Sequence, residues 1–410
     1  MTELSEAVTQ SGQSARNLIL CFDGTNNQFG TINTSIVRLV QVMNREPTQQ
    51  LVFYDPGVGT LPEPGYVSAF GKWLSKIAGL AFGAGLFEKI SDSYIFLMEH
   101  WRPGDRVFLF GFSRGSYTAR ALAAALHMFG LLPSGSAHLV PYLLRLFKAS
   151  RGELRQSPEK QHSYWSLCDQ FRETFSRAIP DCPDRRFPIH FMGVFDTVSS
   201  VGWVWDPLSL PFTSKNPNIA IVRHAVSIDE RRCFFRQNVL ASAPGQDFQE
   251  LWFAGVHSDV GGGYPEADGG LWREPYAWML EAAKAAHFSV DPDRESAVWT
   301  RSNPPQTASM ERQHESLHGA WWLAEFFPKL SYSVTTQKRR PHLGLGRRRR
   351  IPDGALLHPS VLARIRNLDP PYSPGNLPAS LLREIRSGST TEGKVELDAV
   401  DQGGESHESH

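Results

Sequence analysis

The sequence predicts an α/β fold of the α/β-hydrolase type, with a doubly wound, mostly parallel sheet and helical insertions. Short apolar runs alternate with helical patterns along much of the 410 residues, as expected for βαβ units. Each run ends in a loop that contains Gly or Asp, which is typical of central strands followed by functional loops. One run leads into a Gly-x-Ser-x-Gly turn and then into a helix of small residues. These three observations define the predicted fold class.

The predicted elements follow in chain order. Short apolar or aromatic runs indicate five buried strands: Asn17–Phe22, Gln50–Tyr54, Arg106–Phe110, Ile189–Phe195 and Leu251–Val256. Apolar residues at helical spacing indicate three helices: Ile90–Trp101, Tyr117–Leu131 and Trp272–Ala286. Because parallel strands end at the same edge of a sheet, we expect the loops at that edge to form the functional site.

We expect one hydrolase domain over residues 17–386, between disordered ends at residues 1–16 and 387–410. Helical or irregular insertions are expected at about residues 132–186 and 301–350. The second insertion ends in a strongly basic run, Lys338–Arg350. We interpret this run as a solvated extension or hairpin, with a phosphate-binding or lipid-surface patch as the alternative.

Composition narrows the class of protein. Apolar residues make up 41% of the chain, and 42 basic residues balance 42 acidic ones, so charge provides no reason to expect a nucleic-acid partner. No signal peptide or spanning helix is indicated, so we expect a cytoplasmic location, with secretion without a cleaved signal as the alternative. The cysteines lack C-x-x-C spacing and are interpreted as reduced thiols: Cys21, Cys168, Cys182 and Cys233.

The strongest motif is Gly111-Phe-Ser113-Arg-Gly115, which lies between an apolar strand and a helix of small residues. This is the context of a nucleophile elbow, in which a strained serine projects from the sheet and glycines let strand and helix approach closely. We therefore predict Ser113 as a catalytic nucleophile. The N–H of Arg114, at the start of the helix, would face a developing oxyanion.

Two later strand ends provide the partners of a serine nucleophile, in the order Ser, acid, His that this fold uses. Asp196 follows the apolar run Phe191–Phe195, and His257 precedes a loop with three consecutive glycines. We predict a triad of these residues with Ser113. As alternatives, Asp196 is a turn residue and His257 a structural histidine. Other candidates for the orienting acid are Asp206, Asp229 and Asp259.

The loop Cys21-Phe-Asp23-Gly24-Thr25 is similar to a phosphatase motif, Asp-x-Asp-Gly-Thr. The nucleophilic aspartate of that motif is replaced by Cys21, so phosphatase chemistry is disfavoured. Gly24 and Thr25 are instead predicted to complete the oxyanion hole with Arg114, because such a donor comes from a loop after an earlier strand. Asp23 would brace this loop within the substrate site, or serve as an ordinary turn residue.

Further substrate contacts are predicted from an apolar aromatic segment and from one acid. Trp203 and Trp205 belong to the segment Trp203–Phe212, which follows the Asp196 loop and could admit an acyl chain. The alternative is that this segment packs under a loop. Asp259 lies close to His257 in sequence and is predicted to line the substrate site. One His and one Asp form an incomplete metal-ligand set, so we expect no metal and no cofactor.

Taken together, these motifs resemble the family with an uncharacterised α/β-hydrolase domain (DUF2235), which includes the catalytic domain of type VI secretion phospholipase effectors. The matching stretches cover most of residues 17–286: Cys21–Thr25, Tyr54–Thr60, Trp101–Arg120, Gly193–Val198, Ser227–Arg232 and Trp252–Tyr264. The resemblance implies an α/β-hydrolase core with a Ser–Asp–His triad at Ser113, Asp196 and His257. It also implies hydrolysis of glycerophospholipid acyl esters.

The sequence therefore predicts a serine esterase or lipase that forms an acyl-enzyme intermediate. Its expected partner is a small-molecule or lipid ester, and contact with a membrane surface would be peripheral. The alternative function is a non-catalytic α/β-hydrolase-like module that uses the same loops for binding.

Overall fold

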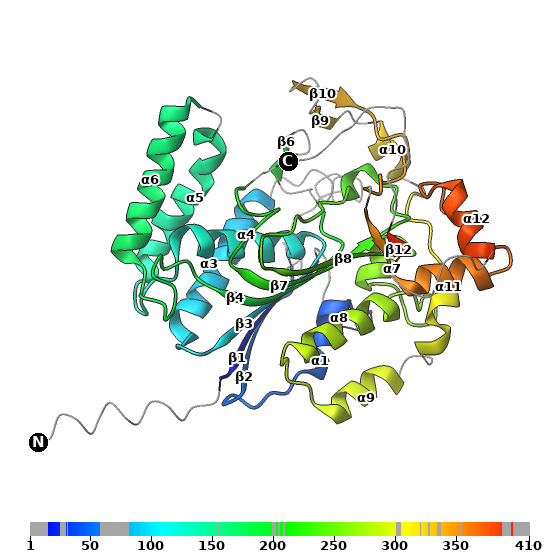
Figure 1. Cartoon of the computed structure of the whole chain (residues 1–410), viewed down its shortest axis with the longest axis horizontal. Helices are drawn as coiled ribbons and strands as arrows, with labels where there is room; N and C mark the ends of the chain where they lie inside the picture. The colour runs from blue at the N-terminus through cyan, green and yellow to red at the C-terminus, as the bar shows by residue number, and fades with distance from the viewer. Residues whose placement is uncertain are drawn as a thin grey trace, which may run out of the picture.

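The computed structural model describes residues 15–24, 30, 32–57, 82–154, 156–198, 202–203, 206–207, 210–300, 305–319, 321–326, 329–333, 338–352, 354–387 and 395–396. A central twisted sheet crosses the molecule, and helices cover both of its faces (Figure 1).

The central sheet has seven parallel strands and an eighth, antiparallel strand at one edge. The order across it is β2-β1-β3-β4-β7-β8-β11-β12. The strands are β1 (Asn17–Phe22), β2 (Gln50–Asp55), β3 (Arg106–Phe112), β4 (Ile189–Phe195), β7 (Ile219–Ser227), β8 (Asp247–Phe253), β11 (Leu356–Leu357) and β12 (Val395–Glu396). Two small antiparallel pairs lie outside it: β5 (Gly202–Trp203) with β6 (Asp206–Pro207), and β9 (Lys329–Ser333) with β10 (Lys338–His342).

The strand order creates a topological switch point between β1 and β3. Strand β1 pairs with β2 on one side and with β3 on the other, so Phe22 lies opposite both Asp55 and Gly111. From β1 the chain goes first to β2 and then returns to β3, after which the sheet grows in the other direction. In open α/β sheets, ligands bind beyond the carboxyl ends of the strands at such a point. Here those ends lead to Asp23 and Ser113.

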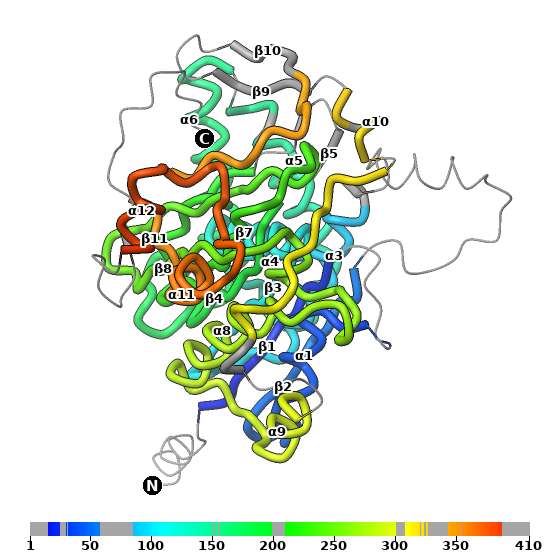
Figure 2. Tube along the Cα trace, turned by 90° about the vertical axis from the view of Figure 1, so that its right-hand side faces the viewer, coloured from blue at the N-terminus to red at the C-terminus, as the bar shows by residue number. Residues whose placement is uncertain are grey.

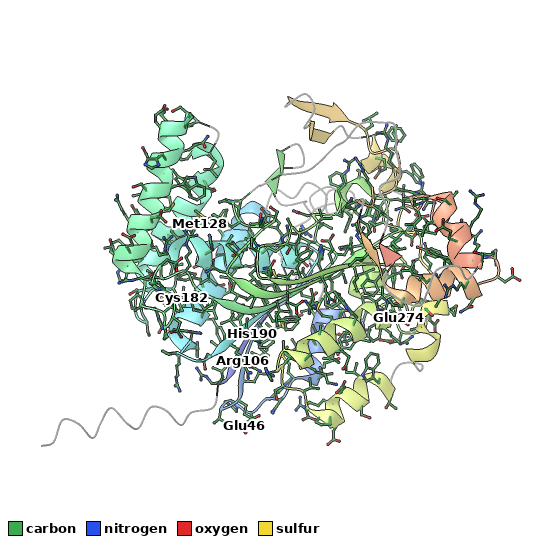
Figure 3. The ribbon with its side chains drawn as sticks, viewed as in Figure 1. Glu46, Arg106, Met128, Cys182, His190 and Glu274 are labelled. Carbon is green, nitrogen blue, oxygen red and sulfur yellow. The ribbon has the colours of Figure 1, made fainter. Side chains whose placement is uncertain are left out.

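Alternation along the strands produces two cores. In β1, Leu18 and Leu20 belong to one apolar cluster and Ile19 and Cys21 to the other. The first cluster is covered by α3 (Phe82–His100), α4 (Arg114–Phe129), α5 (Val140–Glu153) and α6 (Pro158–Phe175). The second is covered by α1 (Ser35–Val42), α8 (Arg273–Ala285) and α9 (Pro292–Thr300). Among the described residues, side chains fill the layers on both sides of the sheet (Figure 3).

The amino-terminal edge of the sheet is tied together by polar side chains. Arg106 donates a hydrogen bond of 3.0 Å from Nε to Oδ1 of Asn17, and this contact links the starts of β3 and β1. The ring of His190, in β4, lies 3.0 Å from the carbonyl oxygen of Ala286. Figure 3 labels Arg106 and His190 at this edge. The opposite edge is therefore left to the loops that follow the strands.

The C-terminal part of the chain packs beside β8 and beyond it. Val361 and Ile365 of α11 (Pro359–Asn367) and Ile385 of α12 (Ala379–Ser387) share an apolar cluster with Trp252 of β8. In both views these orange and red helices lie on the β8 side of the sheet (Figures 1 and 2), and Figure 2 labels β11 between α12 and β8. The remaining short helices are α7 (His257–Gly261), α10 (Trp321–Glu325), and the 3-10 turns η1 (Ala137–Leu139), η2 (Cys233–Phe235) and η3 (Pro305–Met310).

The predicted fold class is confirmed, but one central strand was missed. Strand β7 contains Arg223 and His224, which interrupt its apolar pattern. Both are paired with the neighbouring strand β8, Arg223 with Asp247 at 2.7 Å and His224 with Glu250 at 2.8 Å. These side chains hid the strand from a search for apolar runs. The polar residues Asp247–Glu250 likewise hid the first half of β8, which begins four residues before the predicted strand.

Segments predicted as insertions have defined places. Residues 132–186 contain α5 and α6, and the basic run contributes β10, which forms an antiparallel hairpin with β9. The interpretation of the basic run as a solvated extension or hairpin therefore holds for the hairpin at residues 338–342, but Arg349 is buried and is not solvated. Residues 1–14 and most of residues 387–410 lie outside the described part of the chain. All four cysteines are described, and none of them forms a disulfide.

Candidate active site

Ser113 occupies the turn between β3 and α4, immediately before the first helical residue. Its backbone has φ 60° and ψ −122°, a conformation that residues with a Cβ atom seldom adopt. Its N–H donates a hydrogen bond of 3.0 Å to the carbonyl oxygen of Phe195, the last residue of β4. The turn therefore has the strained backbone expected of a nucleophile elbow, and it is fastened to the end of the next strand.

Both glycines of the motif are required by close packing. A Cβ atom on Gly115 would lie 2.1 Å from the carbonyl oxygen of Phe22 and 2.6 Å from that of Asp23. A Cβ atom on Gly111 would lie 2.5 Å from Cα of Ser116. Helix α4 therefore begins directly against the end of β1. Its amino end, which carries the positive end of the helix dipole, lies at the switch point.

Asp196 and His257 form a buried pair at the same edge of the sheet. Nδ1 of His257 lies 2.5 Å from Oδ2 of Asp196. Asp196 directly follows β4, and its φ of 38° is also in the left-handed region. His257 is the first residue of α7, which follows β8. The structure thus brings to His257 the predicted acid, and it does not bring Asp229 or Asp259.

The ring of His257 lies between two aromatic side chains. Phe112, which precedes Ser113, stacks on the ring at a centroid distance of 4.6 Å, and Phe235 contacts it edge-on at 4.8 Å. Burial lowers the pKa of His257 below its usual range, although the hydrogen bond and charge of Asp196 oppose that shift. A neutral imidazole that donates from Nδ1 carries its lone pair on Nε2. The pair is therefore arranged to accept a proton at Nε2.

The carboxylate of Asp196 is also held by Arg349, from the basic run. Nη1 of Arg349 lies 2.5 Å from Oδ1 of Asp196, and Nη2 lies 3.0 Å from Oδ2. The N–H of Ser227 donates a further hydrogen bond of 2.9 Å to Oδ1. Burial alone would raise the pKa of Asp196, but the charge of Arg349 and the contact with His257 outweigh it and hold the pKa well below its usual range. Asp196 is therefore ionised in the folded protein.

A second buried ion pair lies on the backbone side of His257. Oε2 of Glu230 accepts a hydrogen bond of 3.2 Å from the N–H of His257 and lies 2.9 Å from Nη2 of Arg232. Burial would raise the pKa of Glu230, but Arg232 outweighs it and lowers the pKa to about 2. The guanidinium of Arg232 lies 3.7 Å from the ring centroid of Phe235. Glu230 therefore fixes the backbone of His257 while Arg232 supports one of its ring contacts.

Four buried acids around the site have a partner in the C-terminal segment, defined here as residues 305–387. Arg349 binds Asp196, and the hydroxyl of Ser316 donates a hydrogen bond of 2.8 Å to Glu230. The hydroxyl of Tyr372 donates one of 2.6 Å to Asp229, and Nδ1 of His314 lies 2.7 Å from Oδ1 of Asp259. The site is thus closed by a segment that comes after the strands that build it.

Asp259, predicted to line the substrate site, is instead a buried support. Its Oδ2 accepts hydrogen bonds from the N–H of Val256, at 3.0 Å, and of His314, at 3.2 Å. The ring of His314 stacks on Tyr264 at a centroid distance of 3.6 Å. Because its carboxylate is occupied by α7 and by the C-terminal segment, Asp259 joins these two parts of the chain.

Asp23 braces the loop after β1. Its Oδ2 accepts hydrogen bonds from the hydroxyls of Thr34, at 2.8 Å, and Tyr54, at 3.1 Å. Its Oδ1 accepts one of 2.7 Å from the N–H of Gly24. The Gly24 donor that we predicted for the oxyanion hole therefore points to Asp23 in this structure. It would have to leave that carboxylate to reach a substrate.

The remaining predicted residues differ in what the structure describes. Arg114 begins α4, as predicted, and burial lowers the pKa of its guanidinium to about 10. Thr25, Trp205 and the side chain of Trp203 lie outside the described residues. The predictions for those three residues stay open.

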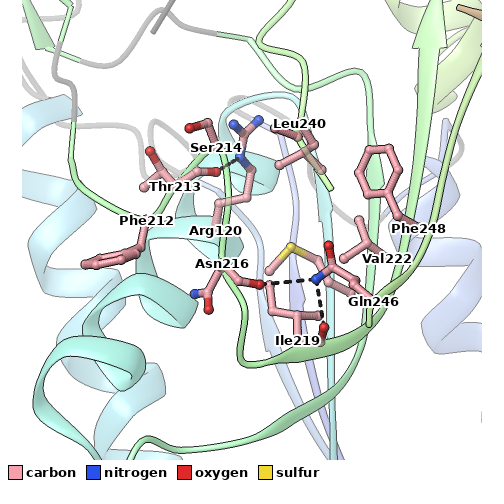
Figure 4. A pocket seen from close by; sticks show the side chains of 12 residues that line it. Arg120, Phe212, Thr213, Ser214, Asn216, Ile219, Val222, Leu240, Gln246 and Phe248 are labelled. Atoms are coloured by element: carbon pink, nitrogen blue, oxygen red, sulfur yellow. Dashed lines mark hydrogen bonds between the residues drawn. The ribbon is translucent and has the colours of Figure 1, made fainter. Parts of the chain in front are cut away.

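Phe212, at the end of the predicted acyl-chain segment, packs inward. It lines a shallow hollow of about 260 Å³, a volume that includes open solvent at its mouth, between α4 and strands β4, β7 and β8 (Figure 4). Its ring contacts that of His127 at a centroid distance of 4.2 Å. Arg120 closes one side of the hollow with hydrogen bonds of 2.6 Å to the carbonyl oxygens of Thr213 and Asn238. No residue of the Asp196–His257 pair lines this hollow, so it is separate from the candidate site.

Sequence reasoning missed Glu230, Arg232 and Arg349. The first two belong to the stretch Ser227–Arg232, which begins at the last residue of β7, so a correct prediction of that strand would have placed them at the functional edge. No comparable signal marks Arg349, which stands among other arginines. Among the described residues, no group of His, Cys, Asp and Glu side chains is arranged to hold a metal ion. No helix in that part of the chain is long and apolar enough to cross a membrane.

The parallel sheet, with a strained serine turn at its switch point, places the protein in the α/β-hydrolase-like class. Residues 16–282 match the model of the type VI secretion system phospholipase effector Tle1-like catalytic domain, and the chain belongs to that family.

Several known proteins resemble the chain. It is 35% identical over 237 residues to the uncharacterized protein YEL023C of Saccharomyces cerevisiae. The matched region covers 56% of this chain and 33% of that protein. The chain therefore spans about a third of that relative. A solved structure of an uncharacterized protein from Pseudomonas aeruginosa gives a TM-score of 0.40 at 17% identity, over 73% of this chain and 49% of the other. The solved structure of the Tle1 effector bound to the VgrG spike of the type 6 secretion system gives a TM-score of 0.31 at 18% identity. That match covers 63% of this chain and 53% of the other.

Proposed function

We propose that the protein is a serine hydrolase of carboxylic esters, in which Ser113 is the nucleophile, His257 the general base and Asp196 the orienting acid. The observation that carries this proposal is the buried Asp196–His257 pair beside the strained Ser113 turn. Two contacts join them: the ring of Phe112 stacks on His257, and the N–H of Ser113 donates to Phe195, the residue before Asp196. The family membership of the chain supports the same reaction class.

In this mechanism Oγ of Ser113 attacks the ester carbonyl carbon and its proton passes to Nε2 of His257. The N–H of Arg114 would stabilise the negative charge on the carbonyl oxygen, and the N–H of Gly24 would join it once it has left the Asp23 carboxylate. Collapse of the tetrahedral intermediate breaks the ester bond, and His257 returns the proton to the leaving alcohol. Water, activated by His257, then attacks the acyl-enzyme and releases the acid and Ser113.

Replacement of the nucleophile tests this proposal. Ser113→Ala should abolish hydrolysis of a soluble p-nitrophenyl ester and labelling by a fluorophosphonate probe, while Ser163→Ala, at an exposed position of α6, should leave both unchanged. Equal hydrolysis by wild type and Ser113→Ala would contradict the proposal. No hydrolysis or labelling by a folded wild-type protein would instead favour the non-catalytic binding module.

We further propose that the ester is a lipid or phospholipid acyl ester, taken from a membrane surface by peripheral contact. An apolar patch lies close to the candidate site and consists of side chains that are 38 to 60% exposed: Trp322, Leu323, Phe326, Leu343 and Leu345. Large exposed apolar patches mark surfaces that meet partners or lipid. The ring of the adjacent Trp321 contacts Phe235, which in turn contacts His257.

The two halves of this apolar patch are joined by Glu325. Its carbonyl oxygen accepts a hydrogen bond of 3.2 Å from Gly344, and its Oε2 accepts one of 3.0 Å from Gly346. Exposed Arg347 and Arg348 follow directly. Apolar side chains beside cationic ones are suited to an anionic bilayer surface, where each cation contributes about 1 kcal/mol.

Vesicle experiments test the lipid substrate and the membrane contact. Wild type should sediment with vesicles that contain anionic phospholipid and release fatty acid from them. Trp322→Ser combined with Leu323→Ser should weaken vesicle binding and fatty-acid release by about tenfold, because each substitution removes apolar area that would be buried in the bilayer. Hydrolysis of the soluble ester should stay unchanged. Leu167→Ser, an equally exposed apolar residue on α6, is the matched control. Undiminished vesicle binding by the double variant would contradict the role of the patch.

A further inference from the structure

We infer that Arg349 is a positioning residue of the catalytic site, whose guanidinium fixes the Asp196 carboxylate in the orientation that holds His257. This inference rests on the proposed hydrolase function. Arg349 lies outside residues 16–282, where the family resemblance is found. The C-terminal segment therefore supplies a functional part of the site, in addition to covering it.

The contacts of Asp196 leave its carboxylate a single orientation. Oδ1 accepts from Nη1 of Arg349, at 2.5 Å, and from the N–H of Ser227, at 2.9 Å. Oδ2 accepts from Nη2 of Arg349, at 3.0 Å, and faces Nδ1 of His257 at 2.5 Å. A two-armed contact between a guanidinium and a carboxylate fixes the plane of both groups. Rotation of the carboxylate away from His257 would break both arms together.

Arg349 is itself held from several elements. Nη1 donates to Oγ of Ser227 at 2.7 Å and to its carbonyl oxygen at 3.2 Å, and Nη2 donates to the carbonyl oxygen of Phe235. The side chain of Asn376 donates a hydrogen bond of 3.1 Å to the carbonyl oxygen of Arg349. The side chain of Arg349 is 2% exposed. The guanidinium is therefore a fixed element between β4, the end of β7 and the C-terminal segment.

The charge of Arg349 also determines how strongly Asp196 stabilises a protonated His257. A cation that contacts both carboxylate oxygens offsets part of the negative charge that would otherwise favour the imidazolium form. In the described part of the chain, three charged side chains besides Arg349 surround His257: Asp196 at its Nδ1, Glu230 at its backbone N–H, and Arg232 paired with Glu230. Because Arg349 pairs with Asp196, its removal would leave the negative charge beside His257 less compensated, which favours the imidazolium form and raises the pKa of His257.

Two substitutions separate orientation from charge. Arg349→Met removes the orientation and the charge, so kcat on a soluble ester should fall about 10- to 100-fold. This is less than the loss of about 10⁴ in kcat that serine hydrolases show when the orienting acid is replaced and the imidazole takes the wrong tautomer. The KM of Arg349→Met should stay within about twofold, and the acidic limb of its pH–rate profile should move up by about one pH unit. Arg349→Lys keeps the charge and loses the fork, so its kcat should fall while its acidic limb stays in place. Arg350→Met, at the exposed neighbour, is the matched control.

A double-mutant cycle identifies the route of action. If Arg349 acts through Asp196, the change Arg349→Met should reduce the rate of Asp196→Asn by less than about threefold, because the group that it positions is already altered. Titration with a fluorophosphonate counts the reactive active sites, so kcat can be given per folded, reactive molecule. A partly unfolded preparation is then not mistaken for a loss of kcat. The inference would be overturned if the rate losses of the two single variants multiplied in the double variant. It would also be overturned if Arg349→Met had the kcat and pH profile of the wild type.

A measurement without turnover distinguishes this inference from the proposed function. The Nδ1 proton of a histidine bonded to a buried carboxylate resonates far downfield, and its assignment to His257 follows from its loss in Asp196→Asn. Its titration should move to higher pH in Arg349→Met and stay in place in Arg350→Met. If the wild type hydrolyses no ester but this shift occurs, the proposed function fails and the positioning stands. If the wild type is active and the titration is unchanged, only the positioning fails.

Discussion

Tyr372 donates a hydrogen bond of 2.6 Å from its hydroxyl to Oδ2 of the buried Asp229. The same oxygen accepts one of 2.8 Å from the N–H of Gly255. These contacts lower the pKa of Asp229, but burial outweighs them and raises it to about 6. Asp229 is one of the four acids that the C-terminal segment contacts, and it therefore gains or loses its charge at mildly acidic pH.

Asp229 should make the folded protein less stable as pH rises. Its pKa is about 6 in the folded chain and about 3.9 in an unfolded chain, so the folded state binds more protons between these values. The stability contributed by the protonated carboxyl is present below about pH 4 and is lost as pH rises through 6. The free energy of unfolding of Asp229→Asn, relative to wild type, should therefore rise by about 2 kcal/mol between pH 4 and pH 7.5.

Urea unfolding at several pH values measures this difference. Asp293→Asn, at an exposed acid of α9, should run parallel to wild type. If Asp229→Asn also runs parallel to wild type, the burial of this carboxyl does not shift its titration.

The strain at Ser113 should be visible in two inactive variants. Ser113→Ala retains a Cβ atom at φ 60° and ψ −122°, whereas Ser113→Gly adopts that conformation without the steric cost. Relief of strain outweighs the extra chain entropy of glycine, so the Gly variant should be more stable than the Ala variant by about 1 kcal/mol. Chemical denaturation of both variants measures this. A less stable Gly variant would mean that the turn is relaxed.

Gly115→Ala should separate the start of α4 from the end of β1. The added Cβ would lie 2.1 Å from a backbone oxygen of Phe22, which cannot move without moving the strand. We expect a loss of about 3 kcal/mol of stability and, with displacement of the turn, at least a tenfold loss of kcat on a soluble ester. The matched control is Gly152→Ala on α5, where a Cβ would meet nothing within 4 Å and helix propensity predicts a gain of up to about 1 kcal/mol. Equal effects of the two changes would contradict the close packing at Gly115.

A fragment that lacks residues 301–410 should not unfold cooperatively. It would lose one hydrogen-bond partner each of Asp196, Asp229, Glu230 and Asp259, and a hydrogen bond to a charged group contributes about 1.5–3 kcal/mol. Loss of the apolar cluster around α11 adds to this cost. Differential scanning calorimetry should show no sharp transition, whereas a chain that lacks only residues 1–14 should retain one. A sharp transition in the short fragment would show that the remaining core is stable alone.

The predictable parts of this protein are those whose signal is local. The strand before Ser113, the glycines around it and the helix after it lie within one short stretch, so composition and spacing suffice to predict the turn. Asp196 and His257 were also found, because each follows a strand that ends in a recognisable loop.

The parts that could not be predicted depend on pairing over long distances in the chain. Arg349 lies 153 residues from Asp196, and its neighbours Arg348 and Arg350 are the same residue type, so no local pattern shows which arginine enters the core. Strand β7 was hidden for a related reason. Its Arg223 and His224 look unsuited to a core strand until their partners on β8 are known.

The two rings that enclose His257 have a consequence for movement during a reaction. Phe112 is stacked on one side of the imidazole, Phe235 lies against its edge, and Asp196 is bonded to Nδ1, so three contacts hold the ring in one position. In a hydrolase with this arrangement, the imidazole transfers protons without changing its position. The serine hydroxyl, the departing alcohol and the incoming water must then come to the same nitrogen in turn. The order of steps would be set by which of them occupies that place.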